Sequence, residues 1–85
     1  MTTDAKLTIR LFAQAREAAG CERLDMAVSG LATVGDLRVR LAADHPQIGA
    51  LLPRCAIAVN RTYASDDETL SPGDEIAVIP PVAGG

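Results

Sequence analysis

Residues 33–42 read TVGDLRVRLA, and this stretch decides the fold because it predicts a single helix set between strand-like segments. Thr33 suits the N-cap position, and Asp36 three residues later completes a capping box with a negative charge in the first turn. Arg38 and Arg40 lie off the apolar stripe of this helix and are expected to face solvent. The stripe consists of the residues that recur at helical spacing, Val34, Leu37 and Leu41.

Alternating apolar and polar residues, typical of strands, lie on both sides of this helix. The alternation covers residues 6–12, 22–28, 54–60 and 75–79, with a short extended piece around Tyr63. A run of good helix formers at 13–20 ends in Gly20 and joins the first two strands. The central helix ends at DHP, since His45 precedes a proline. Residues 71–74 read SPGD, with Pro and Gly where a type II turn requires them, and lead into the last strand.

The order strand, strand, helix, strand, short strand, strand predicts an α+β fold. In this fold one main helix covers one face of a mixed sheet of about five strands. The helix is long enough to form a right-handed crossover between the second and third strands. This is the element order of a β-grasp, or ubiquitin-like, fold. We expect residues 1–79 to form the β-grasp domain and residues 80–85 to form a flexible tail that ends in Gly-Gly.

The composition predicts one small domain with an aliphatic core. The 85 residues are 48% hydrophobic and 22% charged, with one Phe, one Tyr and no Trp. The formal charge is −3, and the sequence has neither a basic block nor a set of aromatic stacking residues, which argues against nucleic-acid binding. The N-terminus shows no apolar leader and no run reaches membrane-spanning length, so we expect a cytoplasmic protein without membrane contact.

No residue cluster inside the predicted fold points to independent catalysis or to a metal site. His45 is expected to stabilise a helix end, and the acidic run 66–68 is expected to be a solvated loop. Residues 60–61 are expected to form a tight turn between two strands. Cys55 alternates with apolar residues and is expected to be buried. Cys21 follows a glycine in a loop, and a disulfide between the two cysteines is the alternative.

The last six residues, PPVAGG, leave the final strand in a form suited to being the substrate of a second enzyme. Pro81 fixes its own φ and biases Pro80 towards an extended conformation, which aims the tail away from the sheet. The segment reaches at most about 20 Å, and Gly84 and Gly85 lack the Cβ that would block a narrow channel. The terminal carboxylate has a reference pKa of about 3.3–3.7, so it is ionised and reacts only after activation by another protein.

The chain resembles the MoaD family, the small subunit of molybdopterin synthase, along nearly its whole length. The segments that carry the resemblance are FAQAREAAG (12–20), TVGDLRVRLA (33–42), AVN (58–60), LSPGDEIAVIPP (70–81) and the ending PPVAGG (80–85). Gly-Gly alone is shared by every ubiquitin-like modifier and sulfur carrier. A Pro-Pro-x-x-Gly-Gly end that follows Asp-Glu and a strand is much more specific.

The resemblance implies a sulfur carrier for molybdenum cofactor biosynthesis. A MoeB-like activating enzyme would use ATP to adenylate Gly85, and sulfur from a donor protein would convert the adenylate to a thiocarboxylate. The tail would then insert into the MoaE-like large subunit, within a heterotetramer, and give its sulfur to the cyclic pterin precursor of the dithiolene that binds molybdenum or tungsten. The carrier would be a co-substrate without a permanent cofactor. The residues that would position Gly85 are Pro80, Pro81, Val82, Ala83 and Gly84.

The strand alternation also predicts which sheet face meets the helix. The helix-facing residues would be Leu7, Ile9, Leu11, Leu24, Met26, Ile57, Val59, Ile76 and Val78. The opposite face would carry Phe12, Ala56, Ala58, Ala77 and Ile79. This face is too apolar for a purely solvated surface. We expect Phe12 and Ile79, near the root of the tail, to dock the partner, with Arg10 and Arg16 as rim charges. The two alanines of the third strand fit docking and simple packing equally well.

Other functions are compatible with the same features. One is a ubiquitin-like modifier, whose tail forms isopeptide bonds with lysines of target proteins. Another is a sulfur carrier for thiamine or cysteine synthesis, and a third is an interaction module with an inert tail. The Pro-Pro-Val-Ala spacer and the match at residues 12–20 favour the molybdopterin carrier over the modifier, whereas carriers of other pathways differ only in the spacer and the docking face.

Overall fold

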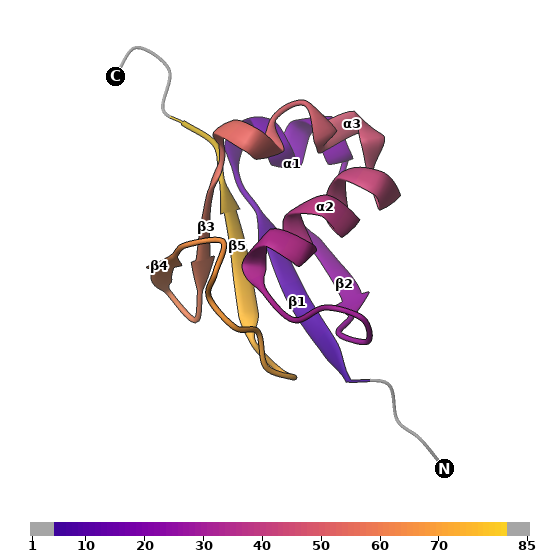
Figure 1. The fold of residues 1–85 in the computed structure, drawn as a ribbon. Coiled ribbons are helices and arrows are strands. Elements are labelled where there is room, and N and C mark those ends of the chain that lie inside the picture. Colours follow the sequence, from indigo (N-terminus) through magenta and orange to yellow (C-terminus); the bar gives the residue numbers. More distant parts are fainter. Residues whose placement is uncertain (1–4, 82–85) are drawn as a thin grey trace.

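A computed structural model describes residues 5–81 of the chain. It contains one five-stranded mixed sheet with the order β2-β1-β5-β3-β4, and α2 packs across one face of it (Figure 1). The strands are β1 (Lys6–Leu11), β2 (Arg23–Ala27), β3 (Ala56–Val59), β4 (Thr62–Ala64) and β5 (Glu75–Ile79). The helices are α1 (Ala13–Ala19), α2 (Val34–Asp44), α3 (Pro46–Gly49) and the 3-10 turn η1 (Leu52–Arg54). The predicted α+β, β-grasp architecture is confirmed.

The last strand, β5, lies in the middle of the sheet. It pairs in parallel with β1, with Leu11 opposite Val78, and antiparallel with β3, with Ala56 opposite Ile79. The strand β2 flanks β1 on one edge, and the three-residue β4 flanks β3 on the other. The ends of β1 and β5 and the start of β3 therefore meet at one end of the sheet.

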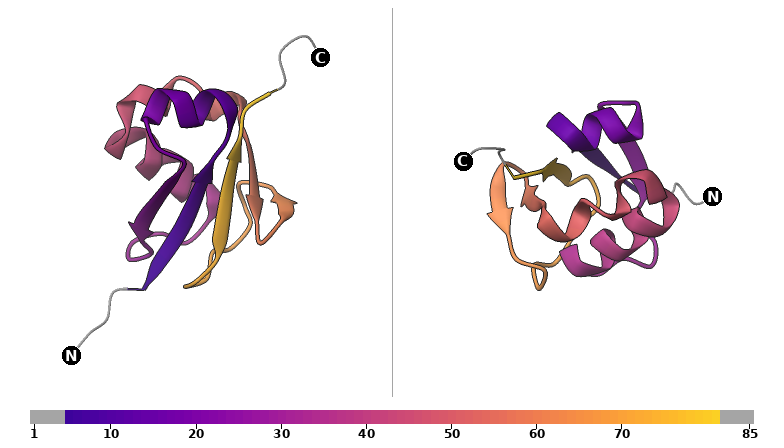
Figure 2. Two further views of the ribbon diagram at one scale, coloured as in Figure 1. Left: turned by 180° about the vertical axis from the view of Figure 1, so that it is seen from behind. Right: turned by 90° about the horizontal axis from the view of Figure 1, so that it is seen from above.

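The core lies between the sheet and α2, and it is aliphatic as predicted. Every second residue of β1 is buried against the helix, as are the apolar stripe of α2 and the alternate residues of β5. Fully burying one such side chain stabilises the fold by about 1.5–3 kcal/mol. The largest buried side chains are Leu7, Ile9, Leu11, Leu37, Leu41, Ile48, Leu52, Ile57 and Ile76. The other sheet face has no helix over its centre, as the view from behind shows (Figure 2).

The start of α2 is fixed by a complete capping box, as predicted from Thr33 and Asp36. The Thr33 hydroxyl accepts a hydrogen bond from the backbone N–H of Asp36 at 3.3 Å. The Asp36 carboxylate accepts from the backbone N–H groups of Ala32 and Thr33, at 3.0 and 3.1 Å. These bonds satisfy backbone donors that have no partner within the helix. The helix ends at His45, whose extended φ of −132° precedes Pro46.

The prediction that Arg38 faces solvent is wrong. Its guanidinium donates hydrogen bonds to the backbone carbonyls of Leu52 and Cys55, and it pairs with the Asp66 carboxylate at 3.1 Å. The Leu52 carbonyl also accepts from the Cys55 N–H at 3.1 Å, so the long arginine side chain adds a second donor there and supplies one to the Cys55 carbonyl. Arg38 therefore ties α2 to η1 and to the loop before β5.

The acidic loop 66–68 is more than a solvated turn. Its side chains are exposed, as expected. Its backbone, however, continues the capping of α2, because the carbonyls of Glu68 and Asp66 accept from the N–H groups of Val34 and Gly35, both at 3.0 Å. The loop thus holds the N-terminus of the main helix against the sheet.

We predict that Asp36 makes the stability of the protein depend on pH in the acid range. The backbone N–H groups of Ala32 and Thr33 lower the pKa of this carboxyl below its ordinary value of 3.8. A pKa that is lower in the folded state contributes stability above the unfolded-state value, and this contribution disappears as the pH falls through the folded-state value. Asp36→Ala should therefore lower the Tm at pH 7, and the difference from wild type should shrink below pH 3.8.

Thermal melts followed by circular dichroism over this pH range measure the effect. Asp67→Ala is the matched control, because Asp67 is an exposed carboxylate in a loop. A Tm difference for Asp36→Ala that stays constant down to pH 2 would contradict this account of the cap.

Candidate functional site

The candidate site begins where β5 ends. Pro80 is buried against the fold and Pro81 is exposed, so the chain leaves the sheet between the end of β1 and the start of β3. The prolines lock φ at this exit. The four residues predicted to carry the chemistry and its positioning, Val82, Ala83, Gly84 and Gly85, lie outside the described residues.

The sheet face turned away from α2 carries the side chains that were predicted to be there. We call this surface the outer face: Phe12, Ala56, Ala58, Tyr63, Ala77 and Ile79. Phe12 directly follows β1 and is 43% exposed, and Ile79, opposite Ala56 in the register, is half-buried. Both lie next to the exit of the chain at Pro80. Their docking role stays a prediction at this point.

Tyr63 was missing from the predicted face. It lies opposite Ala58 on the edge strand β4 and is 72% exposed. The two-residue turn at 60–61 places Thr62 opposite Val59, so Tyr63 shares the face of Ala58. If the alternation of β3 is continued across the two-residue turn into β4, it predicts that Tyr63 lies on the same face as Ala58.

Ala58 lies on the outer face but is only 5% exposed. In the register it stands between Tyr63 and Ala77, and Ala77 stands in turn opposite Arg10. A methyl group on an interior strand barely projects beyond the backbone of its neighbours. The alanines therefore form a low floor between the two aromatic side chains, Phe12 and Tyr63.

Backbone strain occurs at both sides of this floor. The non-glycine residues with positive φ among residues 5–81 are Ala13 (49°), Asn60 (51°) and Arg61 (72°). Ala13 follows Phe12, and Asn60 and Arg61 form the predicted tight turn between β3 and β4. Asparagine tolerates this region, and the Asn60 side chain also accepts from the Glu75 N–H at 3.0 Å. Strained residues of this kind often lie beside binding surfaces.

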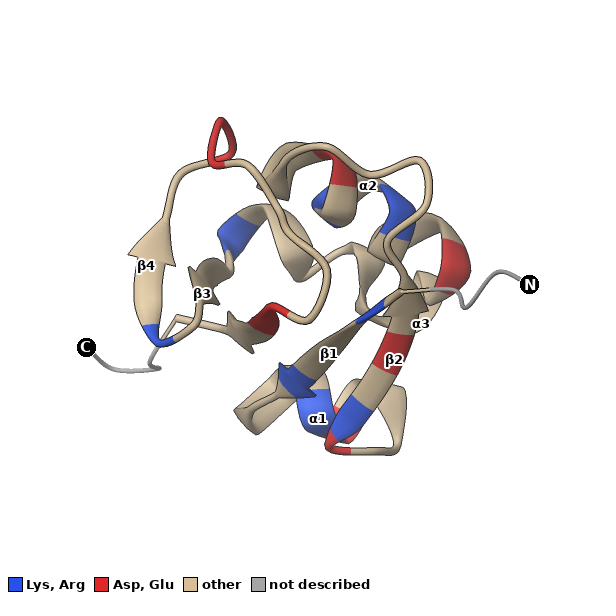
Figure 3. Ribbon diagram, turned by 90° about the horizontal axis from the view of Figure 1, so that it is seen from below, with Lys and Arg blue, Asp and Glu red and all other residues tan. Residues whose placement is uncertain are grey.

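Arginines surround the outer face. Arg10 forms an ion pair with Glu75 at 3.2 Å, and both side chains are partly exposed. Arg16 is exposed on α1, and Arg61 is exposed at the β3–β4 turn. Basic positions lie on β1, on α1 and at this turn in the view from below (Figure 3). The two predicted rim arginines are thus near the face, and their contact with a partner stays a prediction.

The two cysteines differ in burial, Cys21 being partly exposed and Cys55 buried. Both are free, so the alternative of a disulfide between Cys21 and Cys55 is wrong. Cys55 is buried as predicted, and its Sγ–H donates to the Leu51 carbonyl at 3.2 Å. Burial raises the pKa of the Cys55 thiol, although the nearby Arg38 acts in the opposite direction. Cys55 is therefore a protonated core residue.

Metal-ligand clusters and membrane-spanning helices are also absent from the described residues. Between residues 5 and 81 no three His, Cys, Asp or Glu side chains gather closely enough to hold a metal ion. The helices in that range are all too short or too polar to cross a membrane.

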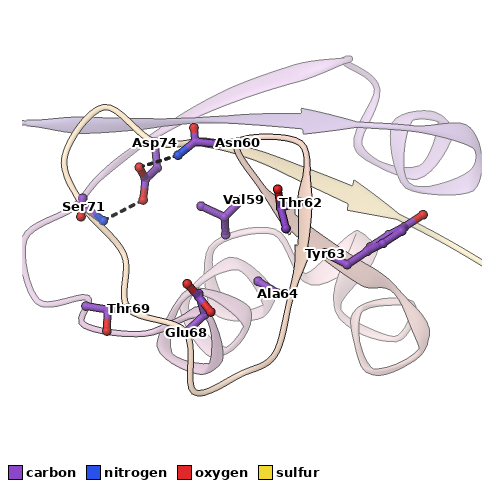
Figure 4. Close-up of a pocket in the computed structure, with 9 residues that line it drawn as sticks. All are labelled: Val59, Asn60, Thr62, Tyr63, Ala64, Glu68, Thr69, Ser71 and Asp74. Atoms are coloured by element: carbon purple, nitrogen blue, oxygen red, sulfur yellow. Dashed lines mark hydrogen bonds between the residues drawn. The ribbon is translucent and has the colours of Figure 1, made fainter.

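A polar hollow of about 400 Å³ lies at the other end of β3, between the β3–β4 turn and the loop before β5 (Figure 4). The Asp74 carboxylate accepts hydrogen bonds from the Asn60 side-chain amide at 3.0 Å and from the Ser71 N–H at 2.8 Å. The Asp74 N–H donates to the Ser71 carbonyl, and Gly73 has a φ of 86°, as the predicted type II turn requires. These groups hold the turn that starts β5, so the hollow has a structural role.

Comparison with known proteins adds to this geometry. Residues 9–85 match the model of the ThiS family. The molybdopterin synthase sulfur carrier subunit of Escherichia coli (strain K12) is 37% identical over 81 residues, which cover 93% of this chain and 99% of that protein.

Two solved structures are also similar. The crystal structure of small archaeal modifier protein 1 from Haloferax volcanii superposes with a TM-score of 0.80 at 34% identity, covering 94% of this chain and 99% of the other. A chain in the complex of subunits 1 and 2 of the molybdopterin-converting factor from Helicobacter pylori 26695 gives a TM-score of 0.68 at 26% identity, covering 94% and 99%.

Proposed function

Because the chain belongs to the ThiS family, we propose that it is a sulfur carrier for molybdenum cofactor biosynthesis, the small subunit of molybdopterin synthase. The observation that carries this proposal is the full-length similarity to a named carrier subunit, joined to a Gly-Gly terminus that follows the central strand.

The reactive group of the carrier is the carboxylate of Gly85. It is ionised at neutral pH and is a poor electrophile. An activating enzyme joins it to AMP from ATP, which supplies the missing leaving group. Sulfide-level sulfur delivered by a donor protein then displaces AMP, and the product is a thiocarboxylate. This sulfur goes to the cyclic pterin precursor inside the large subunit.

The fold supplies position rather than chemistry. The strands β1 and β3 flank β5 on its two sides, with Ile79 paired to Ala56, and the two prolines follow directly after this strand. Beyond them Gly84 and Gly85 present no Cβ, which suits a narrow channel in the partner.

The outer face is the docking surface for the large subunit in this proposal. It is continuous with the tail root, because Phe12 and Ile79 lie beside Pro80. A partner into which the tail inserts must lie against this end of the sheet. An exposed phenylalanine next to half-buried aliphatic side chains suits the centre of such an interface.

The modifier function is the second candidate, and the similarity to small archaeal modifier protein 1 favours it. Both functions need an adenylated terminal glycine. They differ in the next step, since a modifier joins amines whereas a carrier must survive as a free thiocarboxylate. Lys6 is the only lysine of the chain. A single lysine excludes the building of polymeric chains through many lysines. Lys6 also lies at the start of β1, whereas the chain leaves the sheet near the end of that strand.

Tail length should be critical for activity. Deleting Gly85, or adding one residue after it, should abolish dithiolene formation in a reconstituted synthase, because the reacting group is the terminal carboxylate itself. The folded domain should keep its Tm, since the change lies beyond Pro81. Wild-type activity of the extended variant would argue against a terminal sulfur carrier.

Charged substitutions on the outer face should weaken binding more than folding. Phe12→Glu should raise the Kd for the large subunit by about 30-fold, or about 2 kcal/mol, while stability changes by about 0.5 kcal/mol. Ile79→Glu should weaken binding in the same way, with a larger loss of stability because Ile79 is half-buried. The control is Val39→Glu, which charges a 72% exposed residue on α2, away from the outer face. A collapse of the Tm for Phe12→Glu would mean that this side chain belongs to the folding core.

Incubation with ATP, the activating enzyme and a sulfur donor separates carrier from modifier. We expect a monomer whose C-terminal peptide gains the mass of one oxygen exchanged for sulfur. This species should react with the pterin precursor only when the large subunit is present. Covalent adducts to lysines of other proteins as the main product, without transfer to the pterin, would favour the modifier function.

A further inference from the structure

The outer face contains a hollow of about 160 Å³ that the proposed function does not yet use. It is lined by Arg10, Phe12, Arg61, Glu75 and Ala77. A hollow of this size suits a single side chain. Its position beside Phe12 places it inside the surface that the large subunit would cover.

The charges around this hollow do not cancel. Arg10 pairs with Glu75 at 3.2 Å. Arg61 belongs to neither of the two ion pairs within residues 5–81. Two guanidinium groups against one carboxylate leave one positive charge at the hollow. An anionic side chain entering it would meet Glu75, but that carboxylate is already engaged by Arg10.

Arg61 also occupies a backbone position that suits glycine better. It is the second residue of a two-residue turn, with a φ of 72° after 51° at Asn60. Turns with positive φ at both central residues strongly prefer Asn-Gly, because a Cβ clashes with the backbone in this region. Asn60 supplies the side-chain hydrogen bonds of the turn. Arg61 supplies no side-chain hydrogen bond to any residue within 5–81.

We propose that Arg61 receives an Asp or Glu side chain of the large subunit in this hollow, and that the contact speeds and orients docking. The inference rests on the proposed function, since it assumes that the large subunit covers the outer face. This would explain why the turn keeps Arg61 in place of glycine, because the Arg61 side chain would act only in the complex. A positive charge on the rim of an interface acts mainly on the association rate and on its salt dependence.

The test uses the full-length unmodified carrier and the large subunit from the same organism, with association followed by stopped flow at low and high salt. Arg61→Gly should slow association at low salt by about tenfold, because the steering charge is lost. The same variant should raise the Tm by about 4 °C, because it relieves the turn. Arg61→Lys keeps the charge and should associate within about twofold of wild type. Arg61→Glu should be slower than Arg61→Gly and should lose the salt dependence of wild type.

Arg40→Gln is the matched control, since it removes one arginine charge from α2, on the other side of the sheet. It should leave the association rate within about twofold of wild type. Restored association of Arg61→Glu with a large subunit in which one acidic residue has become lysine would identify the pairing residue.

The inference is overturned if Arg61→Gly associates like wild type at both salt concentrations, or if it lowers the Tm. In either case the weak binding of Phe12→Glu would still support the proposed function. If wild-type carrier fails to bind the large subunit at all, the proposed function itself fails, and this inference fails with it.

Discussion

The central position of β5 is the constraint on which the rest of the structure depends. A strand with a hydrogen-bonded neighbour on each side cannot slide or turn over without breaking both ladders. The register of Ile79 against Ala56, and of Val78 against Leu11, therefore fixes the point from which the tail departs. The last strand of the chain therefore lies in the most constrained part of the sheet, and the segment that follows it begins from a fixed place.

The two faces of this sheet differ in composition and, in the proposed function, in role. The face towards α2 is filled by large aliphatic side chains, which supply the core of a small domain. The other face has alanines at its centre, between Phe12 and Tyr63, and this is where the partner would dock in the proposed function. Because the two sets of residues alternate along the same strands, changes to the exposed residues of the outer face, such as Phe12, are expected to have little effect on the core.

Local patterns were enough to predict much of this structure. Two kinds of feature depend only on residues within a few positions of each other: the capping box of Thr33 and Asp36, and the two tight turns. Such features can be predicted from the local sequence. Arg38 could not be placed in this way, because its partners are carbonyls that only the tertiary fold brings near. The burial of Ala58 likewise depends on which strands flank β3. For the candidate site, the outer face followed from alternation, whereas the strained backbone of Arg61 needed the structure.

The pairing of β5 also has a mechanical consequence. Its hydrogen bonds to β1 and β3 run across the strand direction. A pull applied at the end of β5 along that strand would therefore load both ladders in shear, so that many bonds share the force instead of breaking one after another. In the proposed function, the activating enzyme and the large subunit would bind the terminal segment in turn, and this pairing would let them do so without unfolding the domain. The sheet is therefore well built to resist tension along β5.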